Sequence, residues 1–217
     1  MAGKKEVDVI EIRPLDVKTV KITIVGDTPL IVHAWSEKAK RMMLEAQMGE
    51  SKGKKKDIRD PFDDFIQSMY WLTEKPASTP EAFEKAIKKG AKFGFPVGAI
   101  KMAGNSAAYR QGWVKNQMGL RGAYFLKTEW GEMAEIISDA PIMREDMVRI
   151  GMGSADLRYR AEFQNWKMNL LLEYNASGEY SLEQIVNIIN AGGYVCGLGE
   201  WRPEKDGSFG RYHIEMK

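Results

Sequence analysis

The sequence has little of what conventional enzyme chemistry needs. It contains one cysteine and two histidines, which excludes an internal disulfide and a zinc site built from paired Cys and His residues. It has no Walker-type phosphate loop and no Gly-x-Ser-x-Gly elbow. Its Asp and Glu residues lack the spacing of a metal site. We therefore expect no cofactor and no metal ion, and we expect Cys196 to be a small buried side chain.

Bulk positive charge is also absent. The 32 Lys and Arg residues nearly balance the 30 Asp and Glu residues, which excludes a histone-like protein that holds nucleic acid by net charge alone. A site for a polyanion must then be a local patch. No apolar run near the amino terminus resembles a signal peptide or a membrane span, so we expect a soluble, cytoplasmic protein.

The first half of the chain predicts a strand region followed by helices. Residues 17–35 alternate apolar and polar side chains, with a break at Gly26–Pro29. Start signals such as Ser36 and Asp60-Pro61 predict helices over about 37–48, 61–70, 80–89 and 97–117. We interpret residues 36–118 as a helical insertion.

The second half predicts strands and one further helix. The strands are expected at about 120–127, 133–137, 147–150, 158–160, 166–174 and 213–216. Ser181 and Gln184 form a capping-box pattern at the start of the helix. The order of strand, helix, glycine-rich loop and strand predicts an α+β, ferredoxin-like or RRM-like fold, one antiparallel sheet with helices on one face. All residues from 1 to 217 are assigned to this single domain, whose core strands lie in about 17–35 and 120–217.

A dense run of glycine, aromatic and basic residues spans Gly192–Tyr212 (GGYVCGLGEWRPEKDGSFGRY). Glycine lets a backbone approach a ligand closely or adopt positive φ, while Trp and Arg offer a stacking face and phosphate partners. The alternative is a glycine-bearing β-hairpin whose aromatics pack inward. The residues expected at a nucleic-acid site here are Trp201, Arg202, Lys205 and Arg211, with the glycine loop Gly197, Gly199, Gly207 and Gly210.

Basic residues elsewhere extend this prediction. Arg158 and Arg160 share one face of an extended segment at a spacing of roughly 7 Å, close to the step between phosphates. Alternatively, the arginines of this region pair with Glu145, Asp146, Asp156 and Glu162. A basic loop either neutralises phosphates or is simply solvated, and contains Lys52, Lys54, Lys55 and Lys56. The other expected contacts are Arg110, Trp113, Lys115 and Arg149.

His33 is the single candidate for catalysis. It ends the first strand region next to Trp35, where it could act as a general base on a ribose hydroxyl, although a lone histidine is usually a structural residue. His213 is expected to pack in the terminal strand or to face solvent.

Three segments together resemble a known family. The strand end Gly26–His33 (GDTPLIVH), Gly197–Gly199 (GLG) and Gly207–Tyr212 (GSFGRY) are similar to the repeat-associated mysterious protein superfamily, which includes the backbone subunits of CRISPR effector complexes. Most of the chain also resembles uncharacterised bacteriophage and prophage proteins that end in a Gly-x-Gly-Glu-Trp-Arg-Pro-Glu-Lys pattern.

The resemblance implies an RRM-like core that binds single-stranded nucleic acid, often in a head-to-tail filament, with an inserted helical region. Some members of the superfamily cleave RNA with a histidine near the first strand, and His33 has a comparable place. This sequence departs from the pattern because it offers no second catalytic partner and no RRM-type aromatic motif on its central strands. RNA and DNA therefore both remain open as ligands.

Three functions follow as hypotheses. The first is a non-enzymatic, oligomerising protein of phage or prophage origin that binds single-stranded RNA or DNA in recombination, replication or defence. The second is a metal-independent endoribonuclease that uses His33. The third is a structural or protein-interaction subunit without affinity for nucleic acid, whose exposed aromatics contact a partner chain.

Overall fold

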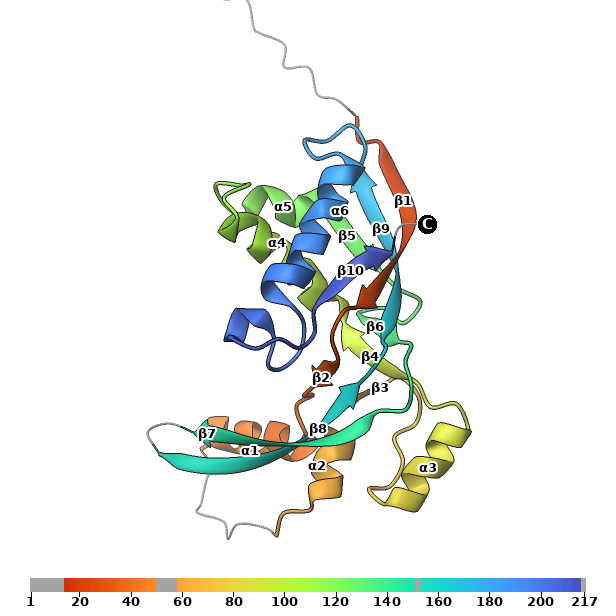
Figure 1. Cartoon of the computed structure of the whole chain (residues 1–217), viewed down its shortest axis with the longest axis vertical. Coiled ribbons are helices and arrows are strands. Elements are labelled where there is room, and N and C mark those ends of the chain that lie inside the picture. Colours follow the sequence, from red (N-terminus) through yellow and green to blue (C-terminus); the bar gives the residue numbers. More distant parts are fainter. Residues whose placement is uncertain (1–13, 50–57, 151–152, 216–217) are drawn as a thin grey trace, which may run out of the picture.

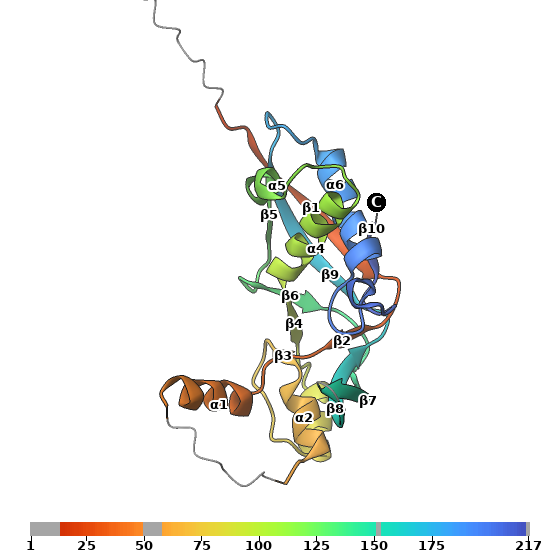
Figure 2. The same cartoon turned by 90° about the vertical axis from the view of Figure 1, so that its left-hand side faces the viewer.

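The computed structural model describes residues 14–49, 58–150 and 153–215, and Figures 1 and 2 show their arrangement from two sides. The described strands form three antiparallel sheets with helices beside them, so the chain is a mixed α/β protein. The expectation of one antiparallel sheet was wrong. The predicted contacts Lys52, Lys54, Lys55 and Lys56 lie outside the described residues.

The largest sheet has four strands in the order β10-β1-β9-β5. These are β1 (Val17–Gly26), β5 (Tyr124–Lys127), β9 (Lys167–Asn175) and β10 (Tyr212–Glu215). Helices α4 (Val97–Arg110) and α6 (Leu182–Ala191) pack against each other on one face of this sheet (Figure 1). Alternate strand residues point at the helices and are buried, so the core lies between these two layers.

The two smaller sheets lie beyond the end of the large one. One has the order β2-β8-β7, with β2 (Leu30–Val32), β7 (Ile142–Ile150) and β8 (Ser154–Phe163). The other has the order β3-β4-β6, with β3 (Tyr70–Trp71), β4 (Phe93–Pro96) and β6 (Met133–Ile136). The helices α1 (Glu37–Gln47), α2 (Pro61–Gln67) and α3 (Pro80–Lys88) belong to this half of the molecule (Figure 1).

Two neighbouring segments of the chain join the two halves. One leads from β1 to β2 and the other from β8 to β9, and hydrogen bonds hold them together. The Gly26 amide donates to the Trp166 carbonyl at 2.8 Å, and the Trp166 indole donates to the Thr28 carbonyl at 2.8 Å. The fully buried Trp166 ring leaves no room for a side chain at Gly26, where a Cβ would lie 2.2 Å from the indole nitrogen. The predicted break at Gly26–Pro29 is therefore where one sheet ends and the next begins.

Several boundaries differ from those expected. The helix predicted to reach Tyr70 ends at Gln67, and the helix predicted to reach residue 117 ends at Arg110, before Gly112 adopts a φ of 71°. Residues 118–123 form helix α5 (Met118–Ala123) where a strand was expected from residue 120. The segment 36–118 also contains β3 and β4, as well as α4, which covers the main sheet.

The capping predictions are confirmed. The Ser36 hydroxyl accepts from the Ala39 amide at 3.1 Å, and Asp60 accepts from the Phe62 amide at 2.9 Å. Ser181 and Gln184 make both hydrogen bonds of the capping box at the start of α6. Local side-chain chemistry thus sets these helix starts.

Candidate nucleic-acid interface

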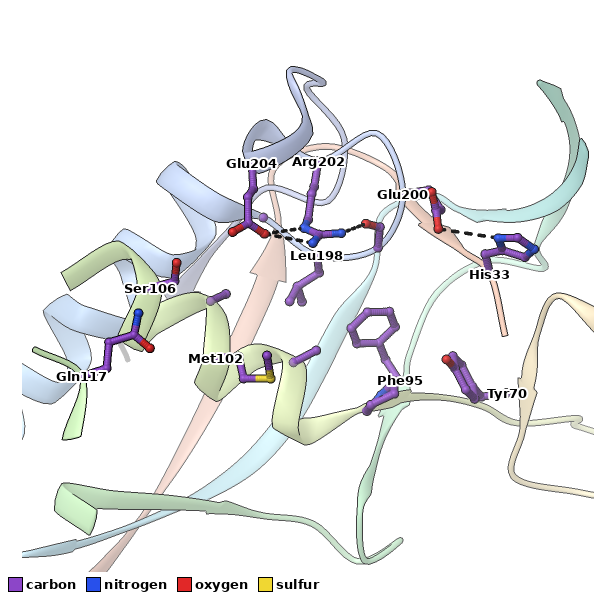
Figure 3. Close-up of a pocket in the computed structure, with 15 residues that line it drawn as sticks. His33, Tyr70, Phe95, Met102, Ser106, Gln117, Leu198, Glu200, Arg202 and Glu204 are labelled. Atoms are coloured by element: carbon purple, nitrogen blue, oxygen red, sulfur yellow. Dashed lines mark hydrogen bonds and ion pairs between the residues drawn. The ribbon is translucent and has the colours of Figure 1, made fainter. Parts of the chain in front are cut away.

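Two hollows meet at His33, just after β2 ends. The first, here the loop cavity, has a volume of about 460 Å³ and lies between α4 and the glycine-rich segment 197–204; Figure 3 shows its lining. The second, here the hairpin hollow, has a volume of about 810 Å³ and lies between α1, α2 and the β7–β8 hairpin. His33 and Glu200 line both, so the two hollows adjoin at this pair of side chains, and together they are here called the groove.

The hairpin hollow presents aromatic and basic side chains together. Trp35 is 60% exposed and shares this lining with Tyr159 and Arg158. Arg59 pairs with Asp64 and, at 2.8 Å, with Asp156, and its guanidinium lies 5.8 Å from the centre of the Tyr159 ring. The hollow therefore offers stacking faces with cations beside them.

A chain of ion pairs runs from Glu200, which lies beside His33, into the β7–β8 hairpin. The Nδ1 atom of His33 lies 3.6 Å from Glu200, and Glu200 lies 3.6 Å from the guanidinium of Arg160 (Figure 3 shows the first pair). Arg160 in turn contacts Asp146 at 3.2 Å, and Asp146 pairs with Arg144 at 2.8 Å. Opposite charges thus alternate from Glu200 through Arg160 and Asp146 to Arg144 on β7.

Glu200 and Tyr70 have shifted pKa values at this place. The neighbouring His33 lowers the pKa of the Glu200 carboxyl, Arg160 and Arg202 add to the effect, and partial burial opposes it. Burial raises the pKa of the Tyr70 hydroxyl. At neutral pH the groove therefore contains an ionised Glu200 and a protonated Tyr70.

The glycine-rich segment is packed against the chain itself. The Glu200 amide donates to the Ile31 carbonyl at 2.9 Å, and the Gly210 amide donates to the Pro29 carbonyl at 2.8 Å. Gly199 has a φ of 71°, and a Cβ on it would lie 2.2 Å from the Ile31 carbonyl oxygen. Built Cβ atoms on Gly197, Gly207 and Gly210 would also meet protein atoms at less than 3 Å. These glycines allow the loop to dock on β2 and on itself, which is a reason for glycine that needs no ligand.

The arginines of the glycine-rich segment are engaged. Arg202 donates to Glu204 at 2.9 and 3.0 Å and to the Gly199 carbonyl at 2.9 Å. The other oxygen of Glu204 accepts from Arg110 at 2.6 Å. Arg211 lies 4.9 Å from the centre of the Tyr194 ring. Arg202 and Glu204 therefore build one wall of the loop cavity.

The structure separates the other predicted contacts. Arg158 lines the hairpin hollow and pairs with Asp156 at 3.4 Å. Arg160 is only 3% exposed and is held by Asp146 and Glu200, so the prediction that it contacts phosphate at the surface is corrected to a buried ion pair. The predicted pairing is confirmed for Asp146, Asp156 and Glu162, whereas Glu145 interacts with the Tyr159 hydroxyl and pairs with no arginine of the described residues. Among the predicted contacts within the described residues, these are exposed but do not line the groove: Arg110, Trp113, Lys115, Arg149, Trp201 and Lys205.

Sequence reasoning missed several groove residues. Glu200 was inside the glycine-rich run, but nothing in the sequence indicated that it would meet His33. Tyr70 and Arg59 come from the segment interpreted as a helical insertion, and the long-range pair from Arg59 to Asp156 has no local signal.

Among the described residues, no group of three His, Cys, Asp or Glu side chains is placed to hold a metal ion. Within the same ranges, no helix has the length and apolar composition needed to cross a membrane. No protein-family model matches the sequence, and no curated protein matches it significantly. The case for a function therefore rests on the geometry and chemistry of the groove.

Proposed function

We propose that this protein binds single-stranded nucleic acid, RNA or DNA, along the groove that passes His33. The observation that carries the proposal is the exposed Trp35, which lines the hairpin hollow with Tyr159 and Arg158. A concave site with flat aromatic faces and adjacent guanidinium groups fits unpaired bases and their phosphates. A duplex hides its base faces by stacking, so it would gain little from these side chains.

Stacking has to supply most of the affinity. Base stacking on an aromatic side chain contributes about 1–3 kcal/mol per base. The cations of the hollow, Arg59 and Arg158, already pair with Asp64 and Asp156, which lowers the net positive charge facing a phosphate. We therefore expect binding with a shallow salt dependence, equivalent to about two or three phosphates.

The connectivity supports an RRM-like core. The order β1, α4, β5, β9, α6, β10 along the chain, with the sheet order β10-β1-β9-β5, matches the split β-α-β pattern of ferredoxin-like folds. Residues 27–96 and 128–166 then form two insertions, and the groove lies where both meet the core. This connectivity and the sequence resemblance together support extending the proposal to the repeat-associated mysterious protein superfamily. The resemblance alone is the reason to propose that phage or prophage encodes the protein and that it assembles along a strand in the host cytoplasm.

Fluorescence anisotropy tests the proposal directly. Labelled single-stranded RNA, single-stranded DNA and duplex DNA are titrated with protein at about 50 and about 200 mM salt. The change in affinity between the two salt concentrations gives the number of phosphates that the protein contacts. We expect a clear preference for a single strand. Absence of binding to all three would overturn the proposal and favour the structural-subunit hypothesis.

A second candidate function is cleavage of bound RNA, and the pairing of His33 with Glu200 favours it. A carboxylate beside Nδ1 orients the imidazole and favours an Nε2 that can accept a proton. In the cleavage step a ribose 2′-hydroxyl gives its proton to Nε2, the 2′-oxygen forms a bond to the adjacent phosphorus, and the bond from phosphorus to the 5′-oxygen breaks, with solvent water protonating the 5′-oxygen.

The test of cleavage compares the wild type with His33→Ala on end-labelled RNA and on DNA of the same sequence. Products that end in a 2′,3′-cyclic phosphate, from the wild type alone, would support the second function. Intact RNA with both proteins, together with unchanged binding, would restrict the protein to binding.

A further inference from the structure

The loop cavity has walls that disfavour a phosphate group. Glu200 and Glu204 both contribute carboxylates to its lining. The neighbouring guanidinium of Arg202 is occupied by Glu204 and by the Gly199 carbonyl. Arg110 and Arg202 both pair with Glu204, and Arg160 pairs with Glu200, so none of these guanidinium groups is free to bind an anion in this cavity. A neutral ligand group is therefore favoured.

The floor of the cavity is apolar and suits a flat ring. It consists of side chains from β4, α4 and the glycine-rich segment: Phe95, Pro96, Ala99, Met102, Ala103 and Leu198. Met102 is 71% exposed, and its thioether can pack on an aromatic face. The volume of about 460 Å³ lies within the roughly 300–1,000 Å³ typical of ligand pockets.

Two polar groups in the lining have unused hydrogen-bonding capacity. The side-chain amide of Gln117 and the hydroxyl of Tyr70 make no hydrogen bond to any described residue, although both line the cavity. An amide donates and accepts side by side, which matches N6 and N7 of adenine, and carboxylates accept from exocyclic amino groups. Uracil and thymine lack such an amino group.

We propose that the loop cavity is a subsite for one unstacked base of the bound strand, and that it favours adenine over thymine or uracil. The inference rests on the proposed function, because the rest of the strand has to lie in the adjoining hairpin hollow. His33 and Glu200 line both spaces, so the base can enter the cavity while its phosphate stays near Arg158.

The test measures the affinity of oligo(dA) and oligo(dT) of equal length for the wild type, Gln117→Ala and Gln111→Ala. Gln111 is a matched control, since it is an exposed glutamine at the end of α4 that does not line the cavity. We expect the wild type and Gln111→Ala to prefer oligo(dA) by about tenfold, and Gln117→Ala to bring the preference within about twofold. Equal affinities in the wild type, or a preference that survives Gln117→Ala, would overturn the inference while leaving the proposed function intact.

A second readout applies even where no oligonucleotide binds, an outcome that would overturn the proposed function. Adenosine and thymidine are titrated into protein with ¹³C-labelled methionine methyl groups, and the Met102 signal is assigned by Met102→Leu. A saturable shift of this signal with adenosine, weakened in Gln117→Ala, would support the base subsite. An unmoved Met102 signal would overturn it.

Discussion

The uncovered face of the four-stranded sheet and the groove at His33 are both exposed, yet they differ in shape and chemistry. The sheet face is opposite α4 and α6 (Figure 1), and its side chains are mostly short or charged. Phe125, 49% exposed, is the large aromatic on this face within the described strands. The groove instead is concave and includes Trp35, Tyr159 and Tyr70.

The difference shows that the fold alone does not locate the site. An RRM-like core would direct attention to the open face of the sheet, where bases stack on aromatic strand residues. Here that face carries local polar pairs, such as Lys127 with Glu173 at 2.5 Å and Thr23 with Asn169 at 2.9 Å. Residues 27–96 and 128–166 build the groove elsewhere, and our proposal places nucleic-acid binding there.

The largest expected effect is on the ion pairs behind the groove. Arg160→Ala leaves the buried Asp146 without one of its partners and should lower the free energy of unfolding by about 3–5 kcal/mol. Arg158→Ala breaks a half-exposed pair and should cost about 1 kcal/mol or less. Urea unfolding followed by circular dichroism measures both. Equal losses would contradict the assignment of Arg160 to the interior.

The next effect concerns the wall of the groove. Gly199→Ala places a Cβ against the Ile31 carbonyl at a positive φ and should cost about 3 kcal/mol in unfolding free energy. Gly131→Ala is the matched control, because Gly131 has a φ of 68° but open space around its Cβ position, and it should cost about 1 kcal/mol. Thermal unfolding compares the two. If Gly199→Ala lowers the unfolding free energy no more than Gly131→Ala, the glycine-rich segment is not held in place by its contact with β2.

A third prediction sets the groove directly against the sheet face. Trp35→Ala removes the exposed stacking surface and should weaken binding of single-stranded oligonucleotides by about 1–3 kcal/mol, roughly 5- to 150-fold. Phe125→Ala, on the sheet face, should leave the affinity unchanged within about twofold. Anisotropy titrations give both affinities. Weaker binding by Phe125→Ala and unchanged binding by Trp35→Ala would place the binding site on the sheet face and contradict the proposal.

The smallest effect is a pH dependence of stability at Glu200. Since the pKa of Glu200 is lowered in the folded protein, its ionised form stabilises the fold above the ordinary value of 4.5, and this contribution is lost as pH falls through the folded pKa. Glu200→Gln should therefore be less stable than the wild type at pH 7, by less than about 1 kcal/mol. Unfolding curves from pH 7 to pH 3 should converge at the acid end. A difference that persists at pH 3 would exclude the carboxylate charge as its cause.

Much of the fold could be predicted from local signals. Alternation over residues 17–26, the caps at Ser36 and Asp60, and the capping box at Ser181 identified elements that the structure contains. The number of sheets could not be predicted, because it depends on how Trp166 packs on Gly26 across 140 residues of sequence. Strand pairing and bends of this kind follow from tertiary packing and leave no local pattern.

The candidate site was predictable only in part. His33 and its neighbour Trp35 were noticed, since both follow a break in the first strand region. Arg160 was misassigned because alternation gives the face of a strand but not whether another element covers that face. The glycines of residues 197–210 were predicted to let the backbone approach a ligand. The structure instead shows that they let the loop pack closely against other parts of the same chain.

Methionine methyl NMR tests the central claim most directly, because methionines mark different regions of the molecule. Met42 lines the hairpin hollow and Met102 the loop cavity, while Met147 lies on the exposed β7–β8 hairpin away from both. On titration with a single-stranded oligonucleotide, the account predicts saturable shifts of the Met42 and Met102 signals and an unchanged Met147 signal. Shifts confined to methionines outside the groove, or no shifts at all, would contradict it.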